Sequence, residues 1–200
     1  GLQILGRNSF ASCAFTHLRI PASLEVIEES AFSACNSLLN VELFDGLKVI
    51  GEDAFTNCSR LRELRLPSTV EMIGANSFAD CTSLEAVDLP KKGLEQIGEY
   101  AFNQARSLQS VAIPSAVENI EDYAFNGCLQ LKVLHLEQGL ETIGAGAFSQ
   151  CSSLSEVSIP STVSTIGDYA FASCGSLRDV VLVDGSLSSI GANAFAFCGM

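Results

Sequence analysis

The sequence predicts a repeat solenoid, in which the chain winds into similar turns that stack on one another. Three observations predict this fold. Phenylalanine recurs at steps of 22 to 24 residues, cysteine stands three residues after all but one of these phenylalanines, and isoleucine stands five residues before all but the first. Self-similarity at such a period is the signature of stacked repeat architectures. The phenylalanines are Phe10, Phe32, Phe55, Phe78, Phe102, Phe125, Phe148, Phe171 and Phe195.

Each unit reads approximately L-x-x-V-x-L-P-S-x-V-x-x-I-G-x-x-A-F-x-x-C. The V-x-L segment alternates with a period of two, which indicates a strand with one buried face. A second apolar pair, such as Val70 and Ile73, indicates a second short extended segment. The A-F-x-x-C segment is expected to form a short helical turn, because residues three apart share one face of a helix. A unit this short buries its apolar side only against neighbours, so we predict one solenoid of about nine repeats over residues 1–200.

The bend after the first strand uses proline in some units and glycine in others, for example Pro67 and Gly139. Proline fixes a φ that suits a turn and glycine supplies a positive φ, so both residues can reverse the chain. Two units carry one extra residue here, within segments 91–93 and 184–186. Insertions are tolerated in surface turns, so this bend is expected to lie outside the core.

Composition excludes several function classes. Lys and Arg total 11 against 23 Asp and Glu, giving a net charge of −12. Nucleic-acid binding and docking on an anionic membrane surface both depend on clusters of basic residues, so neither is expected. No apolar stretch approaches the roughly 18 residues needed for membrane insertion. No arrangement typical of catalysis or nucleotide binding occurs, so we expect no enzyme activity and no cofactor.

The unit and its register resemble the BspA-like class of leucine-rich repeat across essentially the whole chain. The resemblance implies a curved, right-handed leucine-rich-repeat superhelix with a parallel β-sheet on its concave face. It also implies adhesion or binding at the cell surface or as a secreted protein. Because the chain begins and ends within a unit, we expect it to be a piece of a longer array.

The eight cysteines occupy one position of the unit, where Ala105 stands in the remaining repeat. They lie about 23 residues apart, without the close pairs or nearby histidines that a zinc site needs. We therefore expect buried free thiols, which behave as small apolar side chains, and no metal site.

Two surfaces are candidates for binding. The outward residues of the first strands form the concave face, where the candidate protein-binding residues are Glu42, Glu63, Arg65, Asp88, His135 and Glu156. A competing surface is an acidic column, which Lys48 interrupts and which is otherwise expected to keep the protein soluble. Its members are Glu25, Glu71, Glu95, Glu118 and Glu141.

These features favour a non-enzymatic scaffold that binds a protein of unknown identity through the concave face. Two alternatives stay open, a structural spacer or subunit in a larger assembly, and the binding module of a larger enzyme.

Overall fold

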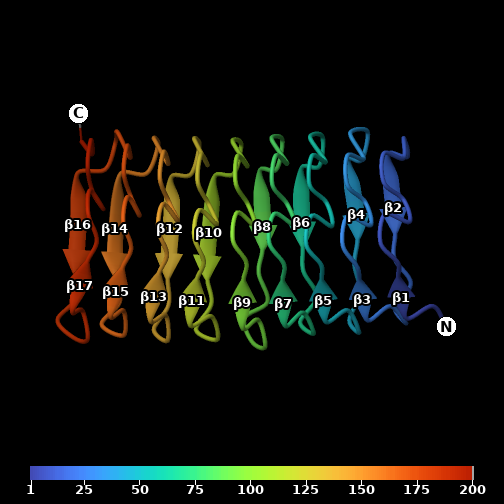
Figure 1. Ribbon diagram of the computed structural model, residues 1–200, viewed down its shortest axis with the longest axis horizontal. Coiled ribbons are helices and arrows are strands. Elements are labelled where there is room, and N and C mark those ends of the chain that lie inside the picture. Colours follow the sequence, from blue (N-terminus) through green and yellow to red (C-terminus); the bar gives the residue numbers. More distant parts are fainter. Residues whose placement is uncertain (200) are drawn as a thin grey trace.

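The computed structural model describes residues 1–199 as a stack of similar turns. The turns lie side by side in sequence order along the long axis, with the two termini at opposite ends (Figure 1). Each full turn contributes one longer strand and one two-residue strand, and all strand pairs are parallel. The predicted period therefore appears directly as the repeat of the solenoid.

The short strands form one unbroken nine-stranded sheet. Each pairs in register with its neighbour one repeat away, as Ile120 does with Ile143. Glycine beside many of these strands permits close approach of the turns: a Cβ on Gly74 would lie 2.7 Å from the backbone of Gly51. The strands are β1 (Ile4–Leu5), β3 (Val26–Ile27), β5 (Val49–Ile50), β7 (Met72–Ile73), β9 (Gln96–Ile97), β11 (Asn119–Ile120), β13 (Thr142–Ile143), β15 (Thr165–Ile166) and β17 (Ser189–Ile190).

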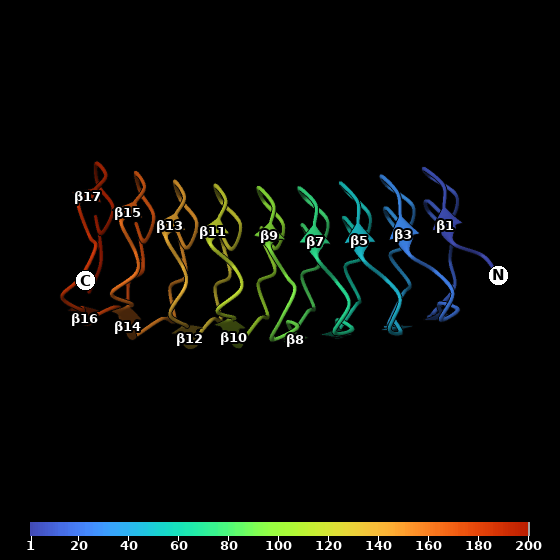
Figure 2. The same ribbon diagram turned by 90° about the horizontal axis from the view of Figure 1, so that it is seen from below.

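The longer strands run along the opposite side of the solenoid (Figure 2). They pair in three groups, β2 with β4, β6 through β12, and β14 with β16. The continuous sheet is thus the one made by the shorter segments. The longer strands are β2 (His17–Arg19), β4 (Asn40–Glu42), β6 (Glu63–Arg65), β8 (Ala86–Asp88), β10 (Ser110–Ile113), β12 (Val133–Leu136), β14 (Glu156–Ile159) and β16 (Asp179–Leu182).

The segment around each phenylalanine forms tight turns, so the prediction of a short helical turn is wrong. The residues two before and two after each phenylalanine of the repeat have positive φ. Around Phe32, for example, these residues are Ser30 (56°) and Ala34 (58°). A left-handed residue interrupts right-handed helical winding. The left-handed conformation also directs alternate backbone N–H groups toward the next turn. The Phe32 N–H, for example, donates to Ala54 O at 2.8 Å. The described residues accordingly contain no helix.

The core is a set of side-chain columns, of which the phenylalanine column is the largest. From Phe32 to Phe171 every ring is fully buried, whereas Phe10 in the first turn is 37% exposed. The ring of Phe125 stacks on Phe102 and Phe148 with centroid distances of 5.1 and 5.3 Å. A central ring thus has two stacking neighbours and an end ring has one, as expected for a solenoid.

The cysteine column packs beside the phenylalanines and bonds to their backbone. Cys58 Sγ donates to Phe32 O at 3.3 Å, and Cys81 Sγ donates to Phe55 O at the same distance. Phe55 O also accepts the Cys58 N–H, so both of its lone pairs are used. From Cys35 onward, each thiol is therefore a small apolar side chain that also donates to a carbonyl of the preceding turn.

Candidate functional site

The outward-facing side chains of the longer strands form one exposed surface, here called the strand face. In most of these strands the residues alternate between exposed and buried, because successive side chains point to opposite faces. All six residues predicted from the sequence lie on the strand face and are exposed. They lie on five strands: Glu42 on β4, Glu63 and Arg65 on β6, Asp88 on β8, His135 on β12, and Glu156 on β14.

Ion pairs neutralise much of the charge on the part of the strand face formed by β2 to β8. Arg19 Nε lies 3.5 Å from Glu42 Oε2, and Arg65 Nε lies 3.7 Å from Asp88 Oδ2. Each pair joins register partners on neighbouring strands. The Arg19 guanidinium also lies 5.2 Å from the centroid of the Phe44 ring. Exposed pairs of this kind contribute about 0–1 kcal/mol to stability.

The part formed by β12 to β16 differs in charge and polarity. Glu156 and Asp179 are register partners on β14 and β16 and lie in none of the ion pairs of residues 1–199. Val133 and Val181 are 60% and 54% exposed. With His135 these side chains line a shallow hollow of about 350 Å³. This surface therefore combines unpaired carboxylates with exposed aliphatic groups.

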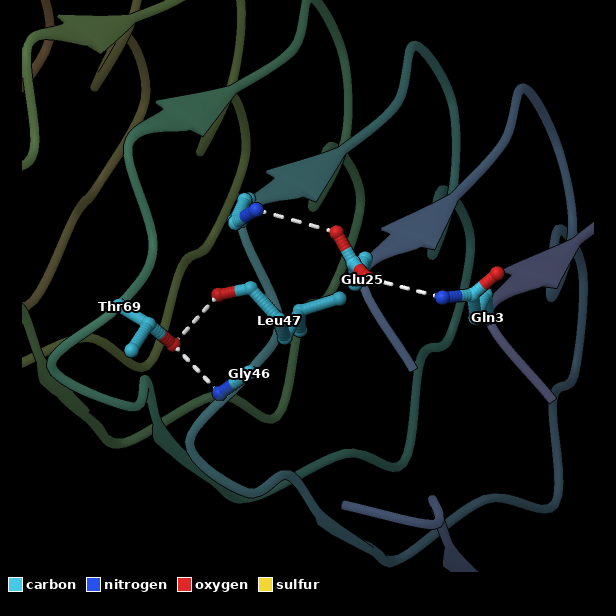
Figure 3. A network of polar contacts seen from close by, with 6 residues as sticks. Gln3, Glu25, Gly46, Leu47 and Thr69 are labelled. Carbon is cyan, nitrogen blue, oxygen red and sulfur yellow. Dashed lines mark hydrogen bonds and ion pairs between the residues drawn. The ribbon is translucent and has the colours of Figure 1, made fainter. Parts of the chain in front are cut away.

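The acidic column lies along the turn side and is partly neutralised. Lys48 Nζ lies 3.0 Å from Glu25 Oε2, and this hydrogen bond raises the pKa of the Lys48 ammonium group. Gln3 Nε2 donates to the other Glu25 oxygen at 3.2 Å (Figure 3). In the next turn, Thr69 Oγ1 donates to Leu47 O at 2.7 Å. The side chains in this region thus connect successive turns.

A second set of turn-side acids has a structural role. Asp122 Oδ1 accepts the Ala145 N–H at 2.7 Å, and Asp168 Oδ1 accepts the Ala192 N–H at 2.6 Å. Each bond satisfies a backbone donor of the following turn. Their carboxylates therefore help to hold the stack together.

All eight cysteines are free thiols, and all except Cys13 and Cys198 are buried. Burial raises the pKa of Cys58 and of Cys128 to about 12. A thiol with such a pKa is protonated at neutral pH, and the thiolate is the nucleophilic form. The central thiols thus have the properties of core groups.

Within residues 1–199, no group of three or more His, Cys, Asp or Glu side chains could hold a metal ion. The same residues contain no helix long and apolar enough to cross a membrane.

Comparison with known families identifies the repeat. The family described as BspA type leucine-rich repeat region (six copies) matches residues 3–132 and 88–200. The chain belongs to this family. Its two matches together span almost every turn, so the whole solenoid is built of BspA-type repeats. Membership supports a repeat-based interaction scaffold.

Several bacterial structures are similar to this BspA-type chain. A leucine-rich repeat protein from Bacteroides ovatus is 24% identical with a TM-score of 0.61, and the match covers 99% of this chain and 62% of that one. The T. pallidum leucine-rich repeat protein is 28% identical with a TM-score of 0.62, covering 88% and 73%.

The pneumococcal vaccine antigen PcpA is 30% identical with a TM-score of 0.64, covering 95% of this chain and 50% of that one. The chain thus spans less than two thirds of the B. ovatus and pneumococcal structures. Comparison with curated proteins gave no match.

Sequence reasoning missed the difference between the two parts of the strand face. Arg19, Asp179 and Val181 were not selected, although each is a register partner of a neighbouring outward residue. Aligning the units by the preceding phenylalanine places Glu156 beside Asp179. The first unit is one residue shorter, and aligning it by the phenylalanine that follows places Arg19 beside Glu42. Comparing the charges at aligned positions would therefore have found both the neutralised and the unpaired carboxylates.

Proposed function

We propose that this BspA-type chain is a non-enzymatic scaffold that binds a partner protein through its strand face. The observation that carries the proposal is the regular presentation of varied, exposed side chains on stacked strands. Stacked repeats create extended surfaces of this kind, which suit protein recognition.

Rigidity of the scaffold supports this choice of surface. The residues next to the outward side chains are core residues, and Leu64, between Glu63 and Arg65, is 1% exposed. The backbone of each strand is also fixed by parallel pairing. A preorganised surface loses less conformational entropy on binding, so more of the contact energy appears as affinity.

The experiment compares the strand face with the acidic turn side. A photo-cross-linking residue is introduced at Ala112 on the strand face or at Glu118 on the turn side, and any cross-linked protein is identified and purified. Its affinity is then measured for two triple alanine variants, one of Arg65, Asp88 and His135 and the other of Glu71, Glu95 and Glu118.

A partner bound by the strand face should lose affinity for the first variant and keep its affinity for the second. Binding to the acidic column should instead weaken steeply with salt, because exposed charges are screened. Loss of affinity confined to the turn-side variant would refute the proposal, as would a cross-linked partner that neither variant weakens.

A further inference from the structure

Within residues 1–199 the carboxylates on β14 and β16 form no ion pair, although Arg178 is next to Asp179 in the sequence. Glu156 and Asp179 stand directly opposite in the ladder, an arrangement that is destabilising for like charges. Lys132 and Arg178 precede β12 and β16 and form no ion pair with either carboxylate. In contrast, the outward carboxylate of Glu42 already forms an ion pair with Arg19. The β14–β16 surface thus retains negative charge that an incoming cation would neutralise.

Exposed aliphatic groups border the same carboxylates. Val133 and Val181 are both more than half exposed; Val133 lies on β12, and Val181 lies on β16, the last of the longer strands. Both line the hollow that Glu156 and Asp179 also line. Lys and Arg match such a surface, because their alkyl stems cover apolar groups while their charged heads reach polar ones.

We infer that this hollow binds an extended segment of the partner protein that carries Lys or Arg next to aliphatic residues. The cationic head lies between Glu156 and Asp179, and the stem and its aliphatic neighbours pack on Val133 and Val181. The inference rests on the proposed function and makes it more specific. It adds a cation-binding contact at β12–β16 to the strand-face contacts of Arg65, Asp88 and His135, of which His135 lines the same hollow.

The probe is a library of random peptides displayed on phage and selected on the full 200-residue chain. We expect enrichment of peptides with Lys or Arg beside Val, Leu or Ile. The selected peptides, made synthetically, should bind the Glu156→Gln/Asp179→Asn variant about tenfold more weakly, since two charge contacts are lost. The matched control, Glu52→Gln/Glu99→Gln, changes two exposed carboxylates that lie outside the strand face and outside the acidic column, so it should bind normally.

Charge reversal gives a second readout. Selection on the Glu156→Lys/Asp179→Lys variant should enrich peptides with Asp or Glu in place of Lys or Arg. Both residues are exposed, so the melting curve of this variant should show an intact fold. Peptides without basic residues, or equal weakening by the two neutral variants, would overturn the inference.

These failures differ from failure of the proposed function. A purified partner that depends on Arg65, Asp88 and His135 would still support the strand face if the peptide experiment failed. A partner that depends only on the turn-side residues would remove the basis of both.

Discussion

Replacing Phe125 with Ala should destabilise the protein strongly. The ring is fully buried and stacks on Phe102 and Phe148 at 5.1 and 5.3 Å. Loss of a buried phenylalanine costs about 3–5 kcal/mol, including the cavity that remains. The two stacked contacts account for about 1–3 kcal/mol of this, at about 0.5–1.5 kcal/mol each. Neighbouring turns are held apart by backbone pairing, so they close the cavity poorly.

The matched control is Phe10→Ala in the first turn. Phe10 is 37% exposed and stacks on one ring of its column, Phe32, at 5.4 Å. Its loss should cost less, because Phe10 buries less apolar surface and loses one stacked contact, although its edge-to-face contact with Phe15 at 6.0 Å is lost as well. Urea unfolding followed by circular dichroism would compare the two midpoints. Equal midpoints, with equal dependence on urea, would refute the stacking argument.

Three further predictions concern the thiols and the unpaired carboxylates. Thiol titration without a reductant should detect few reactive groups in the folded protein and eight after denaturation; fewer than eight would reveal disulfides. Burial raises the pKa of Cys128 from 9.0 to about 12, so the unfolded chain loses this proton first. The urea midpoint should therefore fall as pH rises from 9 towards 12, and Cys128→Ala should reduce that fall; an unchanged slope would contradict it. Glu156→Gln should raise the urea midpoint slightly at low salt, because it removes the repulsion between Glu156 and Asp179. The control Asp88→Asn breaks the ion pair with Arg65 and should not raise the midpoint. Equal effects of the two substitutions would contradict this account of the charges.

Most of the fold follows from the sequence, because a repeat aligns each residue with its spatial neighbour. One alignment of the repeats predicts which side chains stack on one another, that the strands are parallel, and that the phenylalanines and cysteines are buried. The prediction of a helical turn was wrong because Phe32 and Cys35 lie on the same side in a pair of tight turns as well as in a helix. The left-handed positions carry residues such as Ser30, Ala34 and Tyr100 rather than a consistent glycine. What stabilises them is bonding between turns, which a single unit does not reveal.

The candidate site was predictable in position and less so in character. Alternation placed His135 and Glu156 on the outward face, where the structure has them. Their participation in binding stays a prediction. The Arg65–Asp88 pair follows from the register, since the two residues lie one repeat apart. The hollow at β12–β16 depends on how side chains of three strands lie together, which periodicity alone does not specify.

The parallel pairing of successive turns also determines how the protein would respond to a pulling force. The backbone hydrogen bonds that join the turns run along the long axis, so tension between the two ends acts on every interface between turns. The outermost turn has a neighbour on one side only, so it detaches before the turns inside the array. Each released unit of about 23 residues adds about 80 Å of extended chain. An array pulled at its two ends would therefore lengthen in steps of one repeat unit.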